Sequence, residues 1–130
     1  MNRSLAITVV AVLILVLGAV LFASFTKKKE SPTPPARAPV QAVVEITKDG
    51  FNPATLTVKK GTKVVWINKD EAEHRVASNP YPTHTGLPGL DSKKNITQGE
   101  SYSYTFDKGG LFGYHDHLNP VKFKGTVIVE

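Results

Sequence analysis

From Gln41 onward the chain consists of short alternating segments separated by turn residues, and this pattern constrains the fold more than any other feature. Ser101–Phe106 (SYSYTF) alternates polar and aromatic residues, as a strand with one buried face does. Comparable β-branched or aromatic segments occur at Val43–Thr47, Leu56–Val58, Val64–Ile67, Leu111–His117 and Thr126–Val129. Six or seven such strands predict an antiparallel sandwich or barrel. Its expected core aromatics are Trp66, Phe106, Phe112 and Tyr114.

The first 26 residues have a different character. Leu5–Phe25 contains no charged residue and no proline, and a helix of that length, rising about 1.5 Å per residue, crosses a hydrocarbon core of about 30 Å. We therefore predict a transmembrane anchor in residues 1–26, with a signal peptide as the alternative. Residues 27–40 contain four prolines and are predicted to be a semi-extended linker. Residues 41–130 form the predicted domain.

The net charge of +5 is concentrated near the predicted anchor. Residues 1–40 contain five Lys or Arg and one Glu, whereas residues 41–130 contain eleven Lys or Arg and ten Asp or Glu. This distribution suits contact with anionic lipid head groups and gives no indication of nucleic-acid binding. The chain has no cysteine, and Met1 is its single methionine. The domain therefore has no thiolate, disulfide or thioether with which to build a site.

Several motifs of the domain together resemble one protein family. They are GFNPATLTVKKGT at 50–62, VWINKD at 65–70, HRV at 74–76, GESYSYTF at 99–106, GLFGYH at 110–115 and KGTVIV at 124–129. Over nearly all of 41–130 the sequence resembles the plastocyanin/amicyanin-type cupredoxins. The resemblance implies an all-β, cupredoxin-like antiparallel Greek-key β-sandwich. It also implies a periplasmic or extracellular location, with the domain on the extracytoplasmic side of the membrane.

The resemblance breaks at the metal ligands. The family binds copper through two His, one Cys and usually one Met, and His74 matches the first His. Counting from the flanking glycine motifs places either Asp116 or His117 at the Cys position, and Phe123 at the Met position in the second count. Because a Cu–thiolate bond creates the blue-copper site, the sequence predicts a non-blue site. Outer-sphere electron transfer by the usual mechanism is therefore not expected.

The triplet His115-Asp116-His117 offers another kind of site. Residues i and i+2 of a strand share one face, about 6–7 Å apart, so two imidazoles there can chelate one metal ion. The same pair partly resembles the first domain of multicopper oxidases. His84, in the long loop predicted at Ser78–Gly99, is expected to return near this end of the sandwich. Asp116 is either a ligand or an acceptor that fixes an imidazole tautomer. The predicted metal ligands are His74, His84, His115 and His117, holding copper as Cu(II), with Zn(II) as the alternative.

These observations favour a membrane-tethered, extracytoplasmic copper-binding module that binds, sequesters or delivers the ion and is not an enzyme. The expected partners are the membrane, the metal ion and a redox or copper-handling protein. Two alternatives stay open: part of an oligomeric copper oxidoreductase, and an interaction domain with a decayed metal site. The sequence offers no nucleophilic triad and no phosphate loop to support hydrolytic chemistry.

Overall fold

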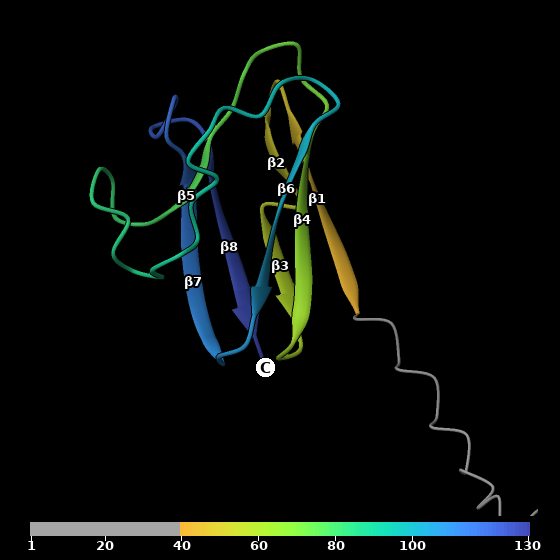
Figure 1. Ribbon diagram of the computed structural model, residues 1–130, viewed down its shortest axis with the longest axis vertical. Helices are drawn as coiled ribbons and strands as arrows, with labels where there is room; N and C mark the ends of the chain where they lie inside the picture. Colours follow the sequence, from red (N-terminus) through yellow and green to blue (C-terminus); the bar gives the residue numbers. More distant parts are fainter. Residues whose placement is uncertain (1–39) are drawn as a thin grey trace, which may run out of the picture. The chain divides into compact units, whose positions relative to one another are not determined.

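The computed structural model describes residues 40–130, which fold as two four-stranded β-sheets (Figure 1). One sheet has the strand order β2-β1-β4-β6 and the other has the order β3-β8-β7-β5. The strands are β1 (Gln41–Thr47), β2 (Gly50–Asn52), β3 (Thr55–Val58), β4 (Thr62–Asn68), β5 (Val76–Ser78), β6 (Ser101–Phe106), β7 (Gly110–Asp116) and β8 (Lys124–Val129). The all-β prediction is therefore confirmed for residues 40–130.

The anchor predicted within residues 1–26 lies outside the described residues, as does the predicted linker apart from Val40. Residues 40–130 include no helix with the length and apolar character needed to cross a membrane.

The two sheets face each other across a core of aromatic and branched side chains. Trp66, near the middle of β4, is fully buried, and so is Tyr114 of β7. Their rings meet edge to face with centroids 5.3 Å apart, and this contact joins the two sheets. Trp66, Phe106 and Tyr114 are core residues as predicted, whereas Phe112 is only partly buried against that core.

The sheets are mixed, and not purely antiparallel as predicted. β1 pairs with β4 in parallel, and β3 pairs with β8 in parallel. After the β1–β2 hairpin the chain enters the other sheet as β3, and it then returns as β4 beside β1, running in the same direction. Alternation in the sequence reports which face of a strand is buried and carries no information about strand direction.

Two strands were not predicted because each has only three residues. β2 and β5 are too short to show a period of two, so residues 40–130 contain eight strands where six or seven were expected. β5 matters for the site, because it pairs with the carboxyl-terminal half of β7 through Val76–Asp116, Ala77–His115 and Ser78–Tyr114.

The predicted loop after Ser78 is confirmed as a long segment, residues 79–100, that lies beside β5 and β7 (Figure 1). It is fixed to the second sheet at several points. Leu90 and Ile96 are buried in the core, and single bridges join Ala77 to Asp91 and His74 to Ile96. Side chains of this segment are therefore held against the end of β7.

Gly125 provides a test of the packing around Tyr114. A Cβ at Gly125 would overlap the ring and hydroxyl of Tyr114, which is directly opposite on β7 and fully buried. We expect Gly125→Ala to lower the free energy of unfolding by about 1–3 kcal/mol, the usual cost of overpacking a core. Urea unfolding measures this change. Gly109→Ala is the matched control, because a Cβ there meets mainly the flexible end of Lys60. Equal unfolding midpoints for the two variants would contradict the packing described.

Candidate metal centre

The alternation of side chains between the two faces of β7 decides where the polar residues at its end point. Tyr114 points into the core, so Asp116, two residues later, points to the same inner side. His115 and the residue after the strand, His117, point to the outer side, which is covered by segment 79–100. Two imidazoles thus lie on one face, as the His-x-His spacing predicts.

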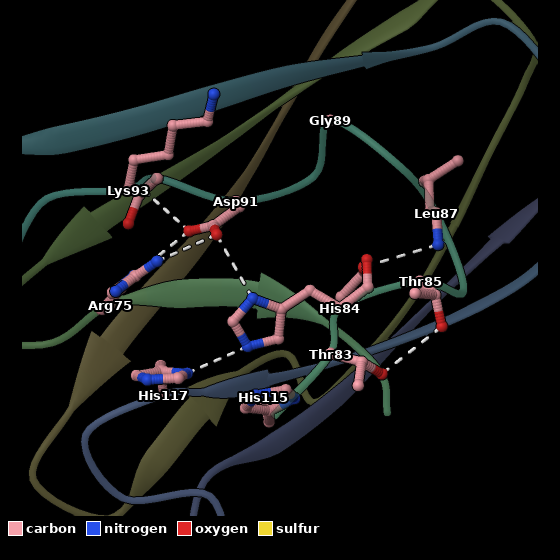
Figure 2. Close-up of polar contacts among 12 residues, drawn as sticks. Arg75, Thr83, His84, Thr85, Leu87, Gly89, Asp91, Lys93, His115 and His117 are labelled. Atoms are coloured by element: carbon pink, nitrogen blue, oxygen red, sulfur yellow. Dashed lines mark hydrogen bonds and ion pairs between the residues drawn. The ribbon is translucent and has the colours of Figure 1, made fainter. Parts of the chain in front are cut away.

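His84 joins these two residues from segment 79–100. One potential ligand atom from each of His84, His115 and His117 lies within 4.8 Å of the other two. Nδ1 of His117 is 2.9 Å from Nε2 of His84. Figure 2 shows His84 directed toward His117, with His115 beside them. We call this set the histidine trio.

The backbone at His84 is unusual. His84 has a φ of 54°, in the left-handed region, which costs a non-glycine residue about 1–2 kcal/mol. The conformation is held by the His84 N–H, which donates to the carbonyl of Pro80 (2.8 Å), and by Ser78 Oγ, which donates to the carbonyl of His84 (2.8 Å). Strained residues of this kind concentrate at functional sites.

His115 is the most deeply buried of the trio, at 1% exposure. Its Nδ1 lies 2.8 Å from Oδ1 of Asn79, and because this oxygen only accepts, Nδ1 carries the proton. Nε2 is then a lone-pair acceptor, and it is buried with no hydrogen-bond partner among the described residues. A buried polar atom without a partner is costly, and a metal ion would satisfy it.

Two glycines give Asn79 the space it needs. A Cβ at Gly113 would collide with the Asn79 side chain, and a Cβ at Gly86 would collide with its carbonyl. Asn79 N–H donates to the carbonyl of Gly113 (3.0 Å), and Gly86 N–H donates to the carbonyl of Asn79 (2.7 Å). The start of segment 79–100 is thereby placed against β7.

The electrostatics at His115 and His117 favour neutral imidazoles. Burial, followed by the neighbouring His84 and His117, lowers the pKa of His115. Burial, followed by the charge of Arg75 and by His84, lowers the pKa of His117. Neutral imidazole is the form that binds a metal ion. Partial burial opposes ionisation of Asp91, but Arg75 and the backbone N–H of Lys93 outweigh it and hold its pKa at about 2.

His74 does not belong to the trio. It is 3% exposed on the inner side, where its Nδ1 lies 2.8 Å from Oδ2 of Asp116 and its Nε2 lies 3.0 Å from Oδ2 of Asp70. Its ring packs on Phe123 with centroids 4.9 Å apart. Of the four predicted ligands, the structure therefore brings three together and places the fourth among carboxylates.

The resemblance implies that copper binds at His74, on the inner side of β7. The residues around His74 do not fit a metal ion. Both ring nitrogens of His74 are engaged by carboxylates, and one of these belongs to Asp116, which the count from Gly110 places at the Cys position. Phe123, which the other count, from Gly125, places at the Met position, packs on the His74 ring. The outer trio does fit, because its imidazoles converge and one of their nitrogens is buried and unpaired.

Sequence reasoning missed the residues that support the trio. Asn79 and Asp91 each contact a ring nitrogen of a trio histidine, and the Tyr81 ring lies 5.2 Å from that of His117. Asn and Asp are common in loops as turn formers, so their presence in a polar segment gave no signal. Only the fold brings them beside the imidazoles.

Comparisons with known proteins agree with this architecture. A family model described as "Cupredoxin-like domain" matches residues 13–129. Amicyanin from Paracoccus versutus is 32% identical over 108 residues, covering 81% of this chain and 77% of that protein. A solved structure of a reduced amicyanin variant is 29% identical with a TM-score of 0.60, covering 75% of this chain and 97% of the other. A purple cupredoxin from Nitrosopumilus maritimus, 22% identical, has the same TM-score of 0.60 and covers 68% of this chain and 99% of its own.

The lowered pKa values predict how acid affects the metal-free protein. Below the ordinary histidine pKa of about 6.5, the unfolded state takes up protons that folded His115 and His117 resist. Stability should therefore fall as the pH drops from 7.5 to 5.5, and Asp91, with a pKa of about 2, does not titrate in this range. Urea unfolding in the presence of a chelator measures the slope. The double variant His115→Gln/His117→Gln should flatten it, and an unchanged slope would contradict the assignment.

Proposed function

The chain belongs to the cupredoxin-like domain family, and from this premise we propose that it is a copper-binding module whose ion is held by His84, His115 and His117. The observation that carries the proposal is the buried Nε2 of His115, which has no partner among the described residues, in a ring that lies beside the imidazoles of His84 and His117. The site departs from the family's usual ligand set, because it contains no thiolate and leaves out His74, the residue that matches the family's first His.

The donor set determines which ion the proposal favours. Imidazole suits copper, zinc and nickel, and among divalent first-row ions copper binds most tightly to a given nitrogen site. The sequence contains no cysteine, so bound Cu(II) would lack the thiolate that gives a blue site. Three imidazoles leave room for a further exogenous ligand, as in other three-histidine sites. We therefore propose copper binding, sequestration or delivery, and Zn(II) is the competing occupant.

The chain's own residues prepare the site for an ion. Asn79 fixes the orientation of His115, Asp91 fixes that of His84, and segment 79–100 excludes water from the His115 ring. An interaction domain with a decayed site would give no reason for three imidazoles to converge, or for a strained backbone at His84. These features support a metal site over a decayed one.

We further propose that the domain is tethered to a membrane and lies on the extracytoplasmic side. This proposal rests on the uncharged run Leu5–Phe25 and on the Lys and Pro residues that follow it. A copper-handling or redox protein that meets the domain near the membrane is the corresponding partner class.

Copper titration of the full-length chain, followed by EPR, tests the proposed site. The wild type should bind one Cu(II) with a type-2 spectrum, nitrogen hyperfine coupling and no intense thiolate absorption. His84→Gln, His115→Gln and His117→Gln should each weaken binding by more than about 100-fold, because even residues that only support ligands contribute about 10–100-fold.

His74→Gln is the matched control, since His74 lies outside the trio. We expect it to leave copper affinity within a few-fold of wild type while lowering stability, because the buried Asp116 carboxylate loses a partner. Absence of copper binding by the wild type would refute the proposed function. An effect of His74→Gln as large as that of His115→Gln would refute the proposed ligand set.

A further inference from the structure

Arg75 and Asp91 form an ion pair that continues into the trio. The guanidinium of Arg75 donates from Nε to Oδ1 of Asp91 (3.2 Å) and from Nη2 to Oδ2 (2.9 Å). Oδ2 of the same carboxylate is 3.2 Å from Nδ1 of His84. The N–H of Lys93 donates to Oδ1 at 2.7 Å. Figure 2 shows this chain running from Arg75 through Asp91 and His84 to His117.

The backbone of Arg75 is tied to β7 as well. Its N–H donates to Oδ1 of Asp116 (2.7 Å), and its carbonyl accepts from the N–H of His117 (2.7 Å). Arg75 thus fixes the backbone of one trio residue directly and the side chain of another through Asp91. The two halves of the trio, from segment 79–100 and from the end of β7, meet at this residue.

A carboxylate constrains the tautomer of the imidazole that it contacts. An ionised carboxylate only accepts, so Nδ1 of His84 must donate, and in the neutral ring the lone pair is then on Nε2. Nε2 is the atom that lies 2.9 Å from His117. The two-point contact with Arg75 fixes the orientation of the carboxylate, because the planar guanidinium matches both of its oxygens.

We propose that Arg75 and Asp91 are positioning residues that select Nε2 of His84 as a metal donor and hold it against the end of β7. The inference rests on the proposed function, since it assigns these two residues a role at that metal site. His115 is held differently, by the neutral amide of Asn79. A charged pair thus supports the ligand from segment 79–100, and an amide supports the ligand on the strand.

The competing explanation is an ordinary salt bridge that fastens segment 79–100 to Arg75, the residue before β5. The pair is partly exposed, with 26% of the Arg75 side chain and 18% of the Asp91 side chain accessible, and such pairs contribute little to stability. A salt bridge of this kind would change stability alone. A positioning pair also changes the tautomer of His84 and the affinity of the trio.

The first experiment reads the tautomer in the metal-free, full-length chain by nitrogen-15 NMR of the histidine rings. In the wild type, neutral His84 should carry its proton on Nδ1. In Asp91→Ala the acceptor is gone, and the proton should redistribute between the two nitrogens. Asp91→Asn keeps the shape and one acceptor oxygen, so it should retain more of the wild-type tautomer. A wild-type His84 protonated mainly on Nε2 would overturn the inference.

The second experiment measures the affinity of the same variants for Cu(II) and, separately, for Zn(II). Asp91→Ala should weaken binding by about 10–100-fold, the usual effect of losing a residue that orients a ligand, with Asp91→Asn between it and the wild type. Arg75→Met should also weaken binding, because the carboxylate loses its fixed orientation. Asp107→Ala is the matched control, since exposed Asp107 lies in the β6–β7 turn, at the opposite end of β7.

The outcomes separate this inference from the proposed function. If the wild type binds neither ion, the proposed function fails, and the role inferred for Arg75 and Asp91 fails with it. If the wild type binds and Asp91→Ala binds as tightly as Asp107→Ala, the metal site stands and the inference fails. If Asp91→Ala does not fold, the tautomer of His84 in the wild type and the affinity and tautomer of Asp91→Asn test the inference instead. A change in urea unfolding without a change in tautomer or affinity would support the plain salt bridge.

Discussion

The carboxylate of Asp116 organises this end of the sandwich. It is 1% exposed and contacts Nδ1 of His74 while accepting hydrogen bonds from the backbone N–H groups of Arg75 and Leu118. These contacts join the segment before β5 to the end of β7 and to the turn after it. Because successive residues of a strand point to opposite faces, fixing Asp116 inward also directs His115 and His117 outward.

This alternation accounts for the two sides of β7 having different chemistry. On the inner side, carboxylates and the Phe123 ring surround His74 and leave its nitrogens engaged. On the outer side, the imidazoles of the trio converge beneath segment 79–100. A cysteine at the position of Asp116 would point to the inner side of β7, and a metal bound to its thiolate would lie on that side. Here an aspartate occupies that position and engages His74, while the outward histidines belong to the trio on the other face.

Much of this was visible in the sequence. The strict alternation of Ser101–Phe106 located β6 to the residue, and the spacing of His115 and His117 placed both imidazoles on one face. Strand direction was not visible, so the parallel pairing of β1 with β4 was missed. The prediction that His74 is a metal ligand together with the trio rested on a motif match. Such a match gives a position along the chain and does not reveal which groups contact the ring nitrogens.

The sequence by itself determined that a metal site in this domain would contain no sulfur and that imidazoles are its candidate donors, since composition restricts ligand chemistry whatever the fold. It also determined that His115 and His117 point to one face of the strand and Asp116 to the other, because a period of two is a property of the strand backbone. The tertiary structure decided which third imidazole joins, and which nitrogens face one another. His84, Asn79 and Asp91 lie far from β7 along the chain, and only the path of segment 79–100 brings them to it.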